Sequence, residues 1–385
     1  MREPPSGVLD AVRELAPSIA ARADEIEAAR CLPADLFGQL KAAGVFRMLT
    51  PRSHGGDEVG LVCSMEVLET LSTADGSVGW TVMIGAESPQ LLSLLPRHTY
   101  DALYQAGPDV TVGGCFVPLG EAQVEDGGYR VGGRWPFASG CERWDYLFSN
   151  CVIVEDGVAR MGADGTAARA ALFLALAAAI EDTWHVLGLR GTGSQHFRVE
   201  GLFVPEDRTF DIFFGVPCVP GVARYPIIDF SFHIGSVVLG IAQAALDEVV
   251  EAAHQRQRTS MRATLAETPL VQYRLGHAET SLRAVRSHLR SEAERISMRR
   301  AGEQEPDYLQ LMTRVYADNA WAAQTCRGVV DDCFSVHGAA GIYDGSRLQR
   351  HLRDIHTIAQ HASLNEHSIT RAGRALLGEQ VDRWF

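Results

Sequence analysis

The sequence contains none of the patterns that mark a metal site, a disulfide framework or a secretory signal. Its eight cysteines stand singly. With no Cys-x-x-Cys pair and no Cys/His cluster at zinc spacing, we expect reduced thiols and no metal. The N-terminal residues show no basic segment followed by an apolar one, and the longest apolar run, from Ala168 to Ile180, is too short to span a bilayer. These absences favour a soluble, cytoplasmic protein.

Positive charge is also scarce. The chain of 385 residues carries 48 Asp and Glu against 35 Lys and Arg, for a net charge of −13. This acidic balance argues against nucleic acid and against an anionic membrane surface as partners. No Gly-x-Gly-x-x-Gly follows a predicted strand, so a nicotinamide dinucleotide site is not indicated either.

What the sequence does contain divides into three regions. Residues 1–108 carry apolar side chains at helical spacing. Residues 109–220 consist of short β-prone runs separated by glycine-rich turns such as Glu125–Gly128, which is typical of an antiparallel β-domain. Residues 221–385 return to helices of the length found in an up-and-down four-helix bundle. We therefore predict an α+β fold with a helical domain, a central β-domain and a C-terminal bundle. The helices expected are 8–29, one beginning at Pro33, 61–71, 234–258, 269–298 and 308–336.

Four segments occur in an order that points to a known family. They are LKAAGVFRMLTPRSHGG, then DGSVGW at residues 75–80, RWPFASG in the β-region, and WHVLGLRGTGS later in it. With the ending HGAAGIYDGSRLQRHLRDIHTIAQHASL, they resemble the acyl-CoA dehydrogenase superfamily over nearly the whole chain. The resemblance implies the same α–β–α fold and a flavin.

The base that dehydrogenases of this superfamily use is missing. They remove the α-proton of an acyl-CoA with a glutamate, whose usual position falls here on Ala362, counted from Arg353-Asp354. The alternative position falls on Phe230, with Asp229 one place away. Without a positioned carboxylate the proton cannot be removed. A dehydrogenase with Asp229 as a displaced base is kept as an alternative.

The sequence instead resembles the two-component (group D) flavin-dependent monooxygenases of this superfamily. The resemblance implies a homotetramer that takes reduced FMN or FAD from a separate reductase, forms a C4a-hydroperoxyflavin with O₂, and oxygenates a small aromatic molecule. N-oxygenation of an amine, and a member that has lost catalysis and acts as a binding subunit, are further alternatives. The Ala, Arg and Gly content hints at bacterial secondary metabolism.

Two residues are the candidate catalytic groups. By resemblance, the hydroxyl of Ser139 lies beside flavin N5, where a hydrogen bond would prolong the hydroperoxide. The alternative is a serine that closes a β-turn. His361 would bond the peroxide or protonate the departing alkoxide. The alternative is a polar residue on a bundle helix.

The candidate binding residues follow from the same resemblance. Small residues after Trp184 would let backbone N–H groups approach a phosphate or the ribityl chain. The expected flavin contacts are Trp135, Phe137, Ser139, Arg190, Gly191, Thr192, Ser194, Arg258, His337, Gly338 and Gly341. The alternatives are a hairpin turn for residues 190–194 and core packing for Trp135 and Phe137. Phenol hydroxylases of this family carry a histidine after the segment that matches Val78-Gly79-Trp80. Here that stretch has Glu87 and Ser88 instead. Either one of these two residues engages the substrate, or the substrate is not activated as a phenolate, which leaves indoles, amines, sulfides and polyketide aromatics open. The candidate substrate contacts are Trp80, Glu87 and, from the first bundle helix, His233; the alternative for Glu87 and His233 is a polar residue of the surface or core.

Overall fold

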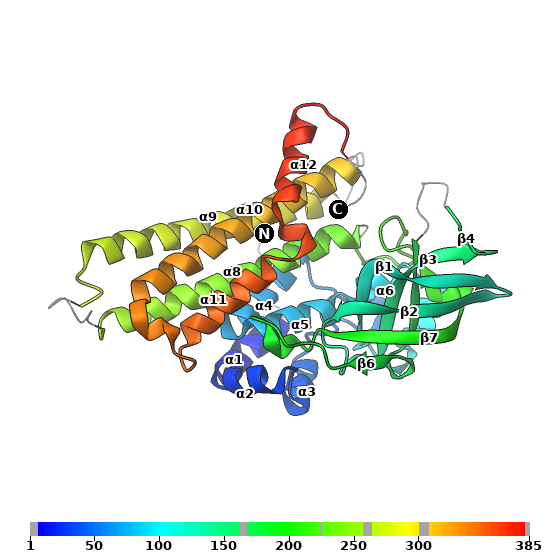
Figure 1. Cartoon of the computed structure of the whole chain (residues 1–385), viewed down its shortest axis with the longest axis horizontal. Coiled ribbons are helices and arrows are strands. Elements are labelled where there is room, and N and C mark those ends of the chain that lie inside the picture. The colour runs from blue at the N-terminus through cyan, green and yellow to red at the C-terminus, as the bar shows by residue number, and fades with distance from the viewer. Residues whose placement is uncertain (1–6, 162–167, 224, 257–263, 300–307, 382–385) are drawn as a thin grey trace.

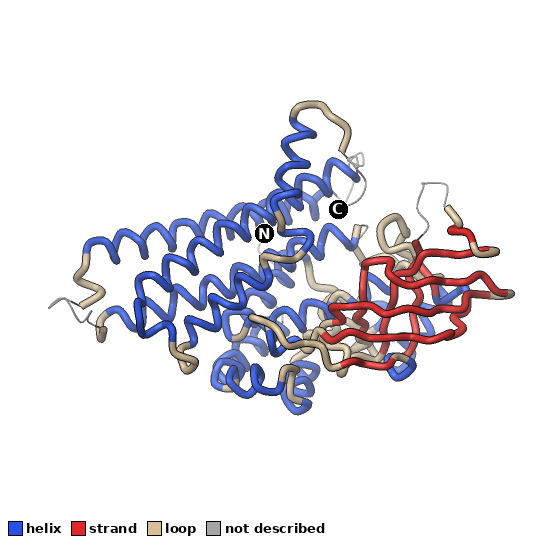
Figure 2. Tube along the Cα trace, in the orientation of Figure 1, coloured by secondary structure: helices blue, strands red, loops and turns tan. Residues whose placement is uncertain are grey.

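The computed structural model describes residues 7–161, 168–223, 225–256, 264–299 and 308–381. Strands form one end of the molecule and long helices the other, with the N-terminal helices beside both (Figures 1 and 2). The N-terminal helices are α1 (Gly7–Ala21), α2 (Ala23–Ala29), α3 (Ala34–Ala42), α4 (Leu61–Ala74), α5 (Gly76–Ala86), α6 (Ser88–Leu92) and α7 (Arg97–Leu103).

Helix α5 is the central element of this region. Asp75 caps it, because its side chain accepts a hydrogen bond from the backbone N–H of Val78 at 3.0 Å. Every residue of α5 except Ile84 is buried, and the helix packs on α4 and α8. The expected helix 8–29 is divided at Arg22, whose guanidinium pairs with Glu25 and Asp35 at the start of the next two helices.

The central region is one sheet of eight strands among the described residues. The order is β6-β7-β2-β1-β3-β5-β8, with β4 on β3. The strands are β1 (Val112–Glu125), β2 (Gly128–Ala138), β3 (Tyr146–Glu155), β4 (Val158–Ala159), β5 (Ala168–Leu174), β6 (Ala179–Glu181), β7 (Gln195–Pro205) and β8 (Thr209–Phe210).

The prediction of a wholly antiparallel sheet is wrong at one pair, since β1 and β3 run parallel. The hairpin through Asp126 and Gly127 pairs β2 with one edge of β1, and β7 takes the other edge of β2. Strand β3 therefore pairs with the free edge of β1. The crossover that reaches it, residues 139–145, passes the start of β1 and carries Ser139.

The C-terminal region contains α8 (Pro226–Ala253), α9 (Pro269–Arg299), α10 (Tyr308–His337), α11 (Arg347–Ile358) and α12 (Glu366–Leu376). Helix α8 begins eight residues before the predicted start at Ile234. Residues 226–234 are all buried, so they have no polar face whose period could be detected. By length and composition α8 alone among the described helices could cross a membrane, but 94% of its apolar window is buried inside the protein, as in the core helix of a soluble protein.

Candidate active site

Three hydroxyl groups and one indole form a continuous chain where α5 meets the sheet. Trp80 Nε1 donates to Ser139 Oγ at 2.9 Å. Ser139 Oγ lies 2.7 Å from Ser194 Oγ, which lies 2.7 Å from Thr192 Oγ1. The backbone N–H of Gly140 also donates to Thr192 O at 2.8 Å. The structure thus brings together four residues that the sequence placed in three separate motifs.

A bulge at the end of β2 shapes this site. The register between β2 and β7 shifts between Trp135 and Ala138, which leaves Pro136 and Phe137 unpaired. Phe137 has φ of 62°, rare for an aromatic residue, and its side chain is 64% exposed. Its ring meets Trp184 edge-on at 6.3 Å. The bulge therefore presents an aromatic ring at the surface two residues before Ser139.

His361 joins this group from the chain segment between α11 and α12. Its ring packs on Trp80 with centroids 5.5 Å apart. The N–H of Ser363 donates to His361 Nδ1 at 3.3 Å, so the single proton of the neutral imidazole is on Nε2. Desolvation by the surrounding protein lowers the pKa of His361 to about 4, although the side chain keeps exposed surface. A neutral imidazole with free surface and an Nε2–H donor results.

A second polar cluster is buried where α4, the C-terminal end of α5 and α8 meet. His233 Nδ1 lies 2.9 Å from Glu87 Oε1, and His233 Nε2 lies 2.8 Å from Ser64 Oγ. Ser64 donates its proton to Leu61 O at 2.9 Å, so it can only accept from His233 Nε2. Burial raises the pKa of Glu87 to about 7. The two residues predicted separately as substrate contacts are therefore hydrogen-bonded partners.

Proton counting fixes the charge of this pair. With Nε2 committed as a donor, the 2.9 Å contact between Nδ1 and Oε1 needs one proton between them. Either arrangement of that proton makes the pair neutral overall. Ser64 completes a Ser–His–Glu geometry, but a hydrolytic role is excluded because Ser64 is fully buried and its proton is already donated.

Several predicted flavin contacts lie elsewhere. Trp135 is fully buried, stacks on Phe197 at 5.2 Å and donates to Asn150 O at 2.8 Å. A side chain with no exposed surface cannot contact a flavin in this conformation, so Trp135 is a core residue. Arg190 forms an ion pair with Glu27 at 2.9 Å. The positive charge that was expected to bind a flavin phosphate is therefore paired with a carboxylate of the protein.

The remaining predictions concern backbone and distant residues. The N–H of Gly191 donates to Ser77 Oγ at 3.2 Å, so it is not available to a ligand. His337 ends α10 at the end of the bundle away from the sheet, with Gly338 and Gly341 directly after it (Figure 1). These three residues do not join the Ser139 group within one chain. Arg258 lies outside the described residues.

The comparisons with known proteins identify the family of this chain. The family models for the acyl-CoA dehydrogenase N-terminal and C-terminal domains match residues 6–94 and 232–366. Indole-3-acetate monooxygenase of Pseudomonas putida is 34% identical over 377 residues, covering 97% of this chain and 93% of the relative. The chain belongs to the flavin-dependent monooxygenases of the acyl-CoA dehydrogenase superfamily.

Two further relatives place this monooxygenase in the two-component branch. The oxygenase subunit HsaA of a flavin-dependent monooxygenase from Rhodococcus jostii is 28% identical, covering 91% of this chain and 92% of the relative. The structure of XiaF from Streptomyces sp., in complex with FADH₂ and glycerol, superposes with a TM-score of 0.87 at 27% identity, covering 97% and 95% of the two chains. The monooxygenase is thus an oxygenase component that depends on reduced FAD or FMN, and the alternatives of a dehydrogenase and of an inactive subunit are wrong.

The monooxygenase holds its hydroxyl-bearing loop through residues that sequence reasoning missed. Leu189 has φ of 52°, and its N–H donates to Asp354 Oδ1 at 2.6 Å. Its carbonyl accepts from Trp184 Nε1 at 3.0 Å and Thr192 Oγ1 at 2.9 Å. Burial and the nearby Asp75 raise the pKa of Asp354 to about 7. In the sequence the Arg353-Asp354 pair served only to locate the position of Ala362. In the structure Asp354 anchors this loop.

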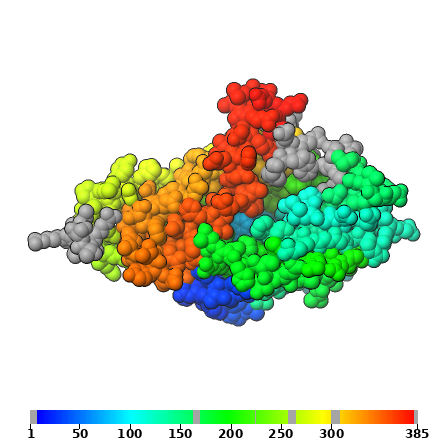
Figure 3. Space-filling view, in the orientation of Figure 1, coloured from blue at the N-terminus to red at the C-terminus, as the bar shows by residue number. Residues whose placement is uncertain are grey.

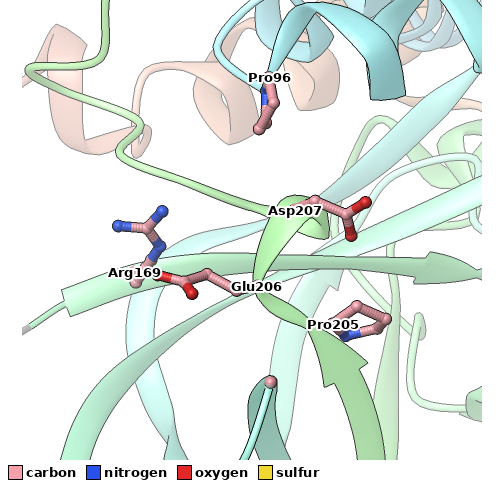
Figure 4. A pocket seen from close by; sticks show the side chains of 6 residues that line it. Pro96, Arg169, Pro205, Glu206 and Asp207 are labelled. Atoms are coloured by element: carbon pink, nitrogen blue, oxygen red, sulfur yellow. The ribbon is translucent and has the colours of Figure 1, made fainter.

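An open hollow on the surface of the monooxygenase is unrelated to this site. It is lined by Pro96, Gly127, Arg169, Pro205, Glu206 and Asp207 (Figure 4). Gly127 precedes β2, whereas Ser139 follows it, so the full length of that strand separates the two regions.

Proposed function

We propose that this monooxygenase oxygenates a small aromatic molecule that carries an N–H or O–H group. Ser139 and His361 face the reacting edge of the flavin, and the Glu87–His233 pair binds the donor group of the substrate. The observation that carries the proposal is the position of Trp80 and Glu87 at opposite ends of one face of α5. Trp80 contacts Ser139 and His361, and Glu87 contacts His233.

The residues around Ser139 fit a reduced flavin. Trp80 occupies one lone pair of Ser139 Oγ, which leaves a second one to accept from a flavin N–H. The exposed ring of Phe137 and the free surface of His361 supply an aromatic and a polar neighbour. When bound, reduced flavin activates O₂ and supplies the oxygen atom. The protein's part is to hold the flavin, to keep a neutral Nε2–H donor on His361, and to limit water.

The face of α5 sets where the substrate lies. Trp80, Ile84 and Glu87 are spaced i, i+4 and i+7, so they share one face of the helix. Their ends are about 10 Å apart along the axis at 1.5 Å per residue. Ile84, the one partly exposed residue of α5, lies between them. This distance suits a bicyclic or monocyclic aromatic ring between the flavin and Glu87.

Glu87 defines the chemistry of the far end. Of its carboxylate oxygens, Oε1 is engaged by His233, and the residue retains 6% exposure. Oε2 is the group proposed to accept a hydrogen bond from the substrate. A buried carboxylate repels anionic groups, so a carboxylate substituent on the substrate must point away from Glu87. Indole has an N–H and resorcinol an O–H, and relatives include indole-3-acetate monooxygenases and an FADH₂-dependent resorcinol hydroxylase.

The assembly and location are part of the same proposal. A separate reductase supplies the flavin, and the enzyme works in the cytoplasm as a homotetramer. Helix α12 projects from the body of the single chain (Figure 3), and Leu376 and Leu377 at its end are 89% and 78% exposed. An apolar tip on a projecting helix supports burial against another copy.

The test is a direct one. The purified protein is mixed anaerobically with reduced FMN or FAD and with indole, indole-3-acetate or resorcinol, and then exposed to ¹⁸O₂. Mass spectrometry should find one ¹⁸O atom in the organic product. Consumption of O₂ with hydrogen peroxide as the sole product for all three substrates would count against the proposed substrate class.

A further inference from the structure

The hydrogen bonds in the hydroxyl chain beside Trp80 run in one direction. Thr192 donates to the carbonyl oxygen of Leu189, an acceptor only, at 2.9 Å. Because a hydroxyl has a single proton, Thr192 must accept from Ser194, and Ser194 must accept from Ser139, each at 2.7 Å. Trp80 Nε1, which can only donate, closes the other end at Ser139.

This direction determines what Ser139 can offer a ligand. Its proton is used on Ser194, so toward any further partner it presents a lone pair and acts as an acceptor. Reduced flavin has an N–H at N5, which is a donor. Oxidised flavin has a bare nitrogen there, which is an acceptor. Two acceptors facing each other across a hydrogen-bonding distance repel, and neither polar group is satisfied.

Burial and a fixed terminal acceptor maintain this direction of the hydrogen bonds between the hydroxyl groups. Ser139, Ser194 and Thr192 are all at most 5% exposed, so water does not compete for their protons. The chain ends on the carbonyl of Leu189, whose N–H is fixed by the buried carboxylate of Asp354 at 2.6 Å. The acceptor at the end of the chain is therefore held in place from α11.

We propose that Ser194 and Thr192 are positioning residues that hold Ser139 as a hydrogen-bond acceptor and so make the site prefer reduced over oxidised flavin. This inference rests on the proposed placement of Ser139 beside flavin N5. This preference would give the hydrogen-bonded hydroxyl groups a role in a two-component system, where flavin must arrive reduced and leave oxidised. The same contact that holds the incoming flavin becomes unfavourable once N5 has lost its hydrogen.

The test compares the dissociation constants of oxidised and reduced FMN and FAD, measured by anaerobic fluorescence titration. In Ser194→Ala the proton of Ser139 is released and can be donated to oxidised N5. The ratio of the oxidised to the reduced dissociation constant should fall about fivefold to tenfold. The midpoint potential of the bound flavin should become more negative, by about 30 mV for a tenfold change. Ser72→Ala, which removes a fully buried hydroxyl bonded to Leu68 O on α4, is the matched control.

A second variant guards against a folding artefact. Thr192→Val keeps the shape of the side chain and breaks the chain one step further along. Ser194 then loses its acceptor and can donate back to Ser139, so the ratio should fall as it does in Ser194→Ala. Circular dichroism and melting curves identify any variant that is not folded.

The outcomes separate the two proposals. If Ser139→Ala changes the affinity for neither form of flavin, Ser139 does not lie beside N5 and the proposed site is wrong. If Ser139→Ala changes the affinity but Ser194→Ala and Thr192→Val leave the ratio equal to that of Ser72→Ala, the orienting role is overturned and the site stands. A fall in the ratio in both variants supports the inference.

Discussion

The indole N–H of Trp80 donates to the hydroxyl of Ser139 across 2.9 Å and joins α5 to the crossover between β2 and β3. Both side chains are at least nine-tenths buried, and the ring of Trp80 also supports His361. Trp80 therefore links the two candidate catalytic residues.

Replacement of Ser139 by alanine should uncouple oxygen use from product formation. One hydrogen bond contributes about 1 kcal/mol, so the ratio of organic product to hydrogen peroxide should fall roughly fivefold to tenfold. Quantifying both products from a known amount of reduced flavin measures this ratio. Ser72→Ala should keep the wild-type ratio, and an unchanged ratio in Ser139→Ala would exclude the predicted role.

Replacement of His361 by alanine should reduce turnover while flavin still binds. A positioned acid or base contributes about a hundredfold or more, so kcat should fall by that factor and the dissociation constant of reduced flavin should change little. Because the pKa of His361 is lowered to about 4, its protonation should produce no step in the pH profile near 6.5. An equal loss of flavin affinity and kcat would instead indicate a structural role.

Replacement of Glu87 by alanine should abolish the selection for a donor group on the substrate. The wild-type enzyme should prefer indole to N-methylindole by about tenfold in kcat/KM, since the methylated ring cannot donate to Oε2. In Glu87→Ala the two substrates should react alike. His233→Gln, which removes the partner of the carboxylate, should weaken the preference. Equal rates on both substrates in the wild type would contradict the anchor.

Replacement of Asp354 by asparagine should change how stability depends on pH. The pKa of Asp354 is about 7 in the folded protein against an ordinary value of 3.8, so the folded state binds more protons in this range. The wild type therefore loses stability as pH rises from about 4 to 7, and the variant does not lose this part. As pH rises from about 4 to 7, the melting temperature of Asp354→Asn should therefore increase relative to that of the wild type. The exposed turn variant Asp126→Asn should show no such gain, and parallel curves for Asp354→Asn and the wild type would refute the assignment.

Much of the fold could be predicted because amphipathic helices leave a clear period in the sequence. The predicted first residues of α9 and α10, Pro269 and Tyr308, agree with the structure. The start of α8 was missed because residues 226–234 are buried on all sides. The parallel pairing of β1 and β3 was missed because strand order depends on which edge remains free, and no local pattern records that.

The site was predicted in its parts but not in its contacts. Ser139, Thr192 and Ser194 were selected individually, whereas the direction of their hydrogen bonds depends on the acceptor at Leu189. Glu87 and His233 were selected for separate reasons, 146 positions apart, and their pairing is a tertiary contact. Trp135 was assigned to the flavin from a motif, and its burial follows from the side of the sheet it faces. Side-chain identity is local, but the partner of a polar atom is not.

The two ends of the proposed site differ in how freely evolution can change them. The flavin end depends on α5, the β2–β3 crossover and the loop at residues 184–194, and a substitution in one of these segments disturbs contacts to the others. The substrate end depends chiefly on the side chains of Glu87 and His233, which are hydrogen-bonded to each other, with His233 also bonded to Ser64. Paired replacements at these two positions can therefore produce descendants that act on new aromatic compounds while inheriting the oxygen chemistry intact.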